Sequence, residues 1–169
     1  MVETRDEIRA HVEATPGIHF SRLRRDLGLA TGQTQYHLRT LTRDGRLVAE
    51  EVAGRTHYYE PTVDPWERCA LAFLRRETAR AIIVRLHADG SAKPCDLAAE
   101  LGLARSTVSW HVSNLADNDV VERSDARPMT VSLARPERTA RLLETASPSL
   151  PDRVVDRFVR TVDELLDGR

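Results

Sequence analysis

The sequence contains few cysteines, few aromatic residues and no long apolar run. Its two cysteines, Cys69 and Cys95, lack the close spacing of a metal site, so we expect neither a disulfide framework nor a bound metal. Aromatic residues form 5% of the chain, which leaves little material to wall a substrate pocket. No segment approaches the roughly 20 apolar residues of a membrane-spanning helix, and the charged N-terminus has no apolar signal segment. These absences predict a cytoplasmic protein without a membrane partner.

Catalytic motifs and an excess of charge are also missing. The chain contains no phosphate-binding glycine loop, no GxSxG motif and no HExxH motif. We therefore expect no enzymatic activity, no catalytic residue and no cofactor. The formal net charge is −1, so a nucleic-acid-binding surface would have to arise from local clusters of basic residues.

An internal repeat is the strongest positive feature. The segment LGLATGQTQYHLRTL at 27–41 returns as LGLARSTVSWHVSNL at 101–115, an offset of 101 − 27 = 74 residues. Such a repeat predicts two copies of one small domain.

Each copy has the same predicted order of elements. In the first copy we expect a helix over 4–14 capped by Thr4, a short helix over 21–27 stopped by Gly28, and a helix over 31–43 capped by Thr31. Alternating residues then predict two strands, over 46–52 and 55–60. Helix, helix, turn, helix and two-stranded hairpin is the order of a winged helix-turn-helix domain. The predicted fold class is mainly α with small β-hairpin wings.

The second copy follows a connecting helix. Asp64 and Pro65 form a strong helix start, and we expect this helix to break near 75–76. Helices are then predicted over 77–87, over 92–101 and from 105 or 106 onward. Strands are predicted over 120–124 and 129–133, and C-terminal helices over 136–146 and from 152. The predicted domains are residues 1–62, a connecting helix over 63–76, residues 77–135, and the C-terminal helices over 136–169. The apolar stripe of Trp66, Ala70, Phe73 and Leu74 is interpreted as packing between the repeats.

Two motifs carry a family resemblance. The pattern RSTVSWHVxxL at 105–115 followed by DVVER at 119–123 resembles the recognition helix and first wing strand of ArsR-type and MarR-type winged-helix transcriptional regulators. The pattern QTQYHLxxL at 33–41 followed by DGRLV at 44–48 is similar. Two such domains in one chain resemble the tandem winged-helix regulators common in archaea. The resemblance implies recognition helices in the major groove of double-stranded DNA and wings on its backbone.

One departure from the resemblance concerns metal. ArsR-type metal sensors carry paired cysteines before the recognition helix, whereas this chain has only Cys95 there. A metal site usually needs three or four ligands. We therefore expect Cys95 to be a small, partly buried residue. The repeated His37 and His111 are likewise expected to pack or hydrogen-bond at the rim of their helices.

The candidate DNA contacts are polar side chains on the outer faces of the recognition helices and wings. Gln33, Gln35 and Arg39 belong to residue types that read purine edges, and arginines nearby can hold phosphates. In the first copy the candidates are Arg22, Arg25, Thr31, Gln33, Gln35, Tyr36, Arg39, Arg43, Arg55 and His57. In the second copy they are Arg105, Ser106, Thr107, Ser109, Trp110 and Arg127.

The last predicted helix has a continuous apolar face. Its spacing predicts a seam for a homodimer, which would place four winged helices on a palindromic site. The residues of this face are Val155, Phe158, Val159, Val162, Leu165 and Leu166.

The sequence thus favours a sequence-specific, DNA-binding transcriptional regulator. An alternative is a tandem winged-helix adaptor that binds protein, like accessory subunits of chromosome condensation, which the near-zero net charge and the acidic second wing favour. A third reading is a regulator that senses an unidentified small-molecule effector or a thiol oxidant.

Overall fold

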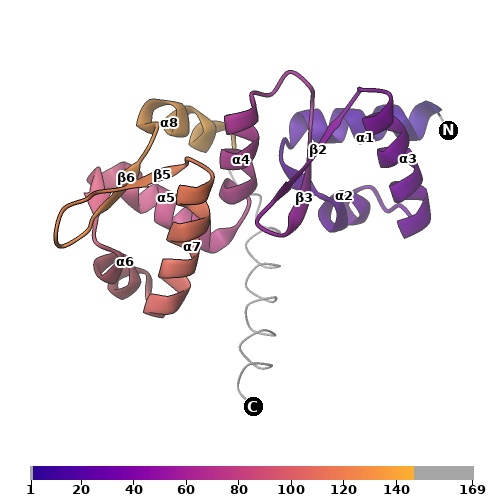
Figure 1. Ribbon diagram of the computed structural model, residues 1–169. Helices are drawn as coiled ribbons and strands as arrows, with labels where there is room; N and C mark the ends of the chain where they lie inside the picture. The colour runs from indigo at the N-terminus through magenta and orange to yellow at the C-terminus, as the bar shows by residue number, and fades with distance from the viewer. Residues whose placement is uncertain (1, 147–169) are drawn as a thin grey trace, which may run out of the picture. The chain divides into compact units, whose positions relative to one another are not determined.

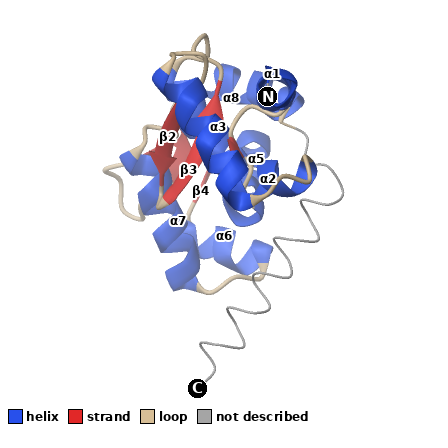
Figure 2. Ribbon diagram, turned by 90° about the vertical axis from the view of Figure 1, so that its right-hand side faces the viewer, coloured by secondary structure: helices blue, strands red, loops and turns tan. Residues whose placement is uncertain are grey.

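Two compact units divide the chain between Ala72 and Phe73. The computed structural model describes residues 2–146, which Figure 1 shows in colour. Helices dominate the fold (Figure 2). Among these residues each unit holds one antiparallel sheet of three short strands.

Apart from one additional short strand, β1 (Ile18–His19), the first unit has the predicted order of helices and strands. It runs α1 (Val2–Ala14), β1 (Ile18–His19), α2 (Phe20–Asp26), α3 (Thr31–Arg43), β2 (Val48–Val52) and β3 (Arg55–Tyr59), and α4 (Pro65–Leu74) spans the boundary.

The second unit repeats this order with one helix added. It runs α5 (Glu77–Asp89), β4 (Ser91–Ala92), α6 (Pro94–Leu101), α7 (Arg105–Asp117), β5 (Val121–Arg123), β6 (Val131–Leu133) and α8 (Pro136–Thr145). The shared order confirms the prediction of tandem winged helix-turn-helix domains.

A small hydrophobic core holds the helices of the first domain together. Ile8 and Val12 of α1 lie one turn apart on the buried face, and Leu23 of α2 packs with them. Leu38 and Leu41 bring α3 onto the same core. A side chain buried this fully contributes about 1.5–3 kcal/mol, so these contacts fix the orientation of α3 and therefore of its outer face.

Each sheet has a third strand that the sequence reading missed. In the first domain the strand order is β1-β3-β2, with Ile18 paired to Tyr58. In the second domain it is β4-β6-β5, with Ala92 paired to Val131. The predicted two-stranded hairpins were therefore incomplete, because a two-residue strand is too short to show an alternating pattern.

Alternation along β3 divides the first sheet into two differently covered faces. Tyr59 and His57 share one face, where the Tyr59 hydroxyl donates to the carbonyl of Arg68 in α4 at 2.7 Å. Glu50 of β2 lies on the same face, and Arg68 Nη1 reaches its carboxylate at 3.4 Å. Tyr58 packs from the opposite face against the helical core. Helix α4 thus covers one face of the sheet, and the helix-turn-helix side of the domain covers the other.

The second domain is built in the same way. Ile82 and Leu86 of α5 and Leu97 of α6 are fully buried. Val112 and Leu115 of α7 are buried as well. The predicted helix over 136–146 is confirmed as α8. Just past its end, the carbonyl of Ala146 accepts a hydrogen bond from Arg80 Nη1 at 2.7 Å.

The connecting helix begins and ends as predicted. Asp64 Oδ1 accepts from the backbone N–H groups of Trp66 and Glu67 at 3.1 and 3.4 Å. Helix α4 stops at Leu74 and α5 begins at Glu77, which confirms the break near 75–76.

Several predicted boundaries were wrong. Thr4 lies inside α1, and the N-cap of α3 is Ala30 rather than Thr31, with no side-chain cap. Strand β2 begins only at Val48, because the backbone N–H groups of Arg46 and Leu47 bond to the carbonyl of Leu41 instead. The other strands and α6 also begin or end within a few residues of the predicted bounds, and Ala92 belongs to β4 rather than α6.

Within residues 2–146, no helix is long and apolar enough to cross a bilayer.

Candidate nucleic-acid interface

The α2–turn–α3 segment forms the helix-turn-helix of the first domain. Leu27 ends α2, and Gly28 follows with φ +62°, the left-handed conformation that glycine adopts without steric cost. Ala30 then starts α3 in an extended conformation. This short turn, together with the buried Leu23 and Leu38, presents one face of α3 to solvent.

The outer face of α3 carries most of the predicted base-reading residues. Tyr36 has 54% of its surface exposed. Arg39 and Arg43 follow on the exposed side, and α3 contains no acidic residue. The candidates that the structure leaves exposed on this helix are Thr31, Gln33, Gln35, Tyr36, Arg39 and Arg43.

Two polar residues of α3 are buried behind its outer face. Thr40 is 8% exposed, and its hydroxyl donates to the carbonyl of Tyr36 at 3.0 Å. His37 is 3% exposed and accepts from Arg5 Nε at 3.4 Å. Burial, together with the guanidinium of Arg5, lowers the pKa of His37 below 6.5. His37 is therefore a neutral structural residue behind the reading face.

The basic candidates of the first domain differ in accessibility. Arg25 at the end of α2 and Arg55 at the start of β3 are exposed. Arg22 is held in an ion pair, since its Nε lies 2.7 Å from Asp26 Oδ2 and its side chain is only 15% exposed. Arg25 and Arg55 are therefore better placed than Arg22 to meet a phosphate.

His57 does not lie where a wing contact requires. It is 1% exposed, and its Nδ1 lies 2.7 Å from the carbonyl oxygen of Gly17. Because a carbonyl only accepts, Nδ1 must carry the proton of this hydrogen bond. The alternation of β3 places His57 on the face covered by α4, so it is unavailable to a phosphate.

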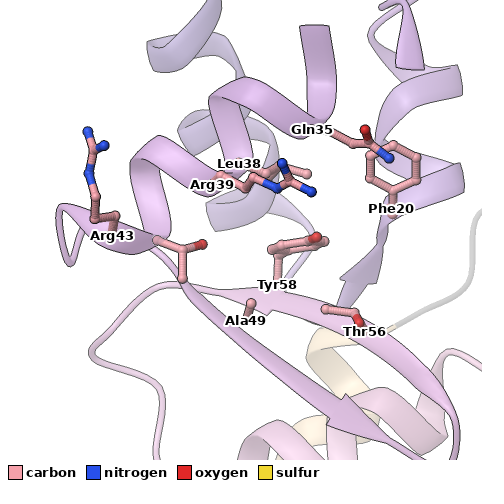
Figure 3. Close-up of a pocket in the computed structure, with 9 residues that line it drawn as sticks. Phe20, Gln35, Leu38, Arg39, Arg43, Ala49, Thr56 and Tyr58 are labelled. Carbon is pink, nitrogen blue, oxygen red and sulfur yellow. The ribbon is translucent and has the colours of Figure 1, made fainter. Parts of the chain in front are cut away.

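A cavity of about 600 Å³ separates α3 from the sheet of the first domain (Figure 3). Gln35 and Arg39 line it from α3, and Thr56 and Tyr58 line it from β3. Among the lining residues the sequence reading singled out only Gln35, Arg39 and Arg43. It missed Phe20, Leu38, Thr42, Ala49, Thr56 and Tyr58. The alternation of Thr56 and Tyr58 could have indicated their shared face, but nothing in the sequence marks the gap opposite.

The second domain presents a different surface on α7. Trp110, at the position equivalent to Tyr36, is 53% exposed, whereas Thr107 is partly buried. The helix carries one arginine, Arg105, and ends at Asp117. The remaining candidates Ser106, Ser109 and Arg127 are exposed.

The two recognition helices share an aromatic–histidine pair. The rings of Tyr36 and His37 meet edge to face with centroids 5.3 Å apart, and those of Trp110 and His111 do so at 4.8 Å. Burial, followed by the charge of Arg76, lowers the pKa of His111. The repeat therefore conserves a neutral histidine beneath an exposed ring.

The structure describes Cys95, the candidate metal or thiol residue, but not the predicted dimer seam. Cys95 is exposed, contrary to the expected partial burial, because it lies in the first turn of α6 on its solvent side. Among residues 2–146 no group of three metal-ligating side chains comes together. The predicted dimer seam, from Val155 to Leu166, lies outside the described residues.

Two protein-family models match the chain, one in each domain. A model described as an N-terminal HTH domain matches residues 2–71. A model described as winged helix-turn-helix DNA-binding matches residues 75–122. No curated protein matches the chain.

Proposed function

We propose that this protein, a DNA-binding regulator built from two winged helix-turn-helix domains, recognises a specific duplex sequence chiefly through its first domain. Helix α3 would enter the major groove, with Gln33, Gln35 and Arg39 contacting base edges. Arg25, Arg43 and Arg55 would hold phosphates on either side.

The charge of the two recognition helices carries this proposal. Helix α3 exposes Arg39 and Arg43 and has no carboxylate. Helix α7 has Arg105 at its start but Asp117 at its end, and Asp125 is exposed in the following wing. Since phosphates repel carboxylates, the second domain would bind DNA more weakly. Its contacts would come from Arg105, Ser106, Thr107, Ser109, Trp110 and Arg127.

A homodimer would double the number of reading helices. This part of the proposal rests on the apolar spacing of Val155, Phe158 and Val162 in the sequence. Two copies related by a two-fold axis would favour a palindromic target.

An adaptor that binds protein is the second candidate function. The exposed Trp110, with the acidic residues Asp117 and Asp125 in the same domain, favours it. An aromatic side chain on a surface of low positive charge is typical of a protein interface.

Selection from a random duplex library tests the proposed function. Wild type should enrich one motif, and the double variant Arg39→Ala/Arg55→Ala should bind that motif at least about tenfold more weakly, since one bidentate base contact is worth roughly 1–3 kcal/mol. Arg141→Ala removes an exposed arginine of α8, which belongs to neither recognition helix nor wing, and serves as the control. Failure to enrich any motif would contradict sequence-specific recognition, and unchanged affinity of the double variant would contradict the assignment to α3.

A further inference from the structure

The cavity between α3 and the sheet has the size of a small-molecule site. Its volume of about 600 Å³ falls within the range of roughly 300–1,000 Å³ typical of ligand pockets. It opens beside the face of α3 that we assign to DNA (Figure 3).

The inner wall of the cavity is apolar and partly aromatic. Phe20, at the start of α2, and Tyr58 of β3 both pack against the hydrophobic core while also lining the cavity. Leu38 lies between them on α3, and Ala49 of β2, paired with Tyr58, contributes only a methyl group. Two rings and a short side chain leave room for a flat apolar body.

The polar wall has one dominant charge. Arg39 extends over the cavity in Figure 3, and it makes no ion pair among the described residues. Arg43 lines the outer end, but its Nε lies 3.2 Å from Asp44. No lining residue is acidic, and Glu51, opposite Thr56 in the sheet, lies beyond the lining. The charge of this wall therefore suits an anion.

Uncharged hydrogen-bonding groups line the cavity together with the guanidinium of Arg39. Gln35 supplies an amide from α3 and Thr56 a hydroxyl from β3. Burial raises the pKa of the Tyr58 hydroxyl, which keeps it protonated and able to donate. These groups can orient a carboxylate that Arg39 attracts.

The second domain fills the corresponding place with its own side chain. By the offset of 74, Ala49 corresponds to Arg123 and Arg39 to Ser113. Arg123 Nη2 donates to Ser113 Oγ at 2.9 Å, so this arginine bridges β5 and α7. Ala49 cannot make such a bridge, which leaves the groove of the first domain open.

We propose that this cavity binds a small carboxylate with a flat aromatic body, and that the bound molecule excludes DNA. The ring lies along Phe20 and Tyr58, and the carboxylate pairs with Arg39. Because Arg39 and Gln35 also belong to the proposed reading face, ligand and DNA compete for them. The exclusion of DNA rests on the proposed function, whereas ligand binding does not.

Titration calorimetry with 2-naphthoate tests the site on the full chain without DNA. We expect saturable binding in the micromolar to millimolar range, and about tenfold weaker binding of the neutral 2-naphthamide, since an Arg–carboxylate pair is lost. Arg39→Gln should weaken naphthoate to the level of the amide, and Ala49→Leu should abolish binding by filling the cavity. Arg141→Gln should change nothing.

Three results would overturn the site: no saturable naphthoate binding, equal binding of the amide, or full affinity in folded Ala49→Leu. Backbone amide NMR spectra establish that each variant is folded and that the perturbed signals belong to α3, β2 and β3.

A DNA arm separates the two parts of the proposal. With a selected duplex, saturating naphthoate should raise the apparent Kd of wild type but leave that of Ala49→Leu unchanged. Naphthoate binding with unaltered DNA affinity would refute competition and keep the site. A protein that binds naphthoate but no duplex would instead refute the proposed function.

Discussion

Exchange of His57 or Arg55 for alanine separates the buried part of β3 from its exposed end at the turn of the wing. Both residues lie on β3, two positions apart, and both were candidates for phosphate contact. His57 is buried against the carbonyl of Gly17, whereas Arg55 is exposed at the turn. We expect His57→Ala to destabilise the first domain without a direct effect on DNA, and Arg55→Ala to do the reverse.

The size of the His57 effect follows from what the ring touches. Its removal leaves the buried Gly17 carbonyl without this hydrogen bond, at about 1–3 kcal/mol, and leaves a cavity between β3 and the elements packed on it. Together these effects cost about 3 kcal/mol. For a domain of this size that corresponds to a fall in Tm of roughly 12 to 24 °C. Arg55→Ala should change stability by less than about 0.5 kcal/mol.

Two assays on the full chain measure the two effects. Calorimetric melting follows the transition of the first domain, and fluorescence anisotropy gives the DNA Kd well below that transition. In Arg55→Ala the loss of one phosphate contact should reduce the slope of log K against log salt by about 0.9. In His57→Ala the slope should equal that of wild type.

One pattern would refute this reasoning. If His57→Ala melted like wild type and lost a unit of salt slope while folded, His57 would contact phosphate and the assigned face of β3 would be wrong. A large fall in Tm for Arg55→Ala would equally contradict its exposure.

Three further predictions concern strain, pH and assembly. Gly17→Ala should destabilise the first domain by more than Gly54→Ala, as measured by urea unfolding. Both glycines have positive φ, but only at Gly17 would an added Cβ lie 3.3 Å from Leu71 Cβ. Equal losses of stability in the two variants would contradict this packing. Burial and Arg5 lower the pKa of His37 below 6.5, so the unfolded state binds more protons than the folded state as the pH falls. The free energy of unfolding of the wild-type protein should therefore decrease below about pH 6.5, and that of His37→Gln should decrease less steeply. Parallel plots of stability against pH for the two proteins would exclude the role of His37. Removal of residues 150–169 should convert a dimer into a monomer by light scattering, and an unchanged mass would argue against the C-terminal seam.

Much of the architecture was predictable because it depends on local pattern. The repeat at 27–41 and 101–115 marks two domains, and the spacing of Leu38 and Leu41 separates the buried from the outer face of α3. The start of α4 at Asp64 and the end of α2 at Gly28 were also predictable, because side-chain capping and a positive φ depend on only a few neighbouring residues.

Features that depend on distant partners were not predictable. His57 looks like a wing residue in the sequence, and only the packing of α4 on β3 shows that it is buried. Strand β1 is visible only through its pairing with β3. The cavity forms only because Phe20 of α2, Arg39 of α3 and Tyr58 of β3 come together in the fold, and no local sequence pattern predicts that these three elements are neighbours.

The salt dependence of duplex binding tests the central claim most directly. Binding of the selected motif by wild type should weaken steeply with salt, with log K falling by about 0.9 for each phosphate contacted. The Arg39→Ala/Arg55→Ala variant should bind more weakly with a smaller slope, and Arg141→Ala should match wild type. Absence of saturable duplex binding at ordinary salt, with a folded wild-type protein, would contradict the DNA-reading account and favour the adaptor.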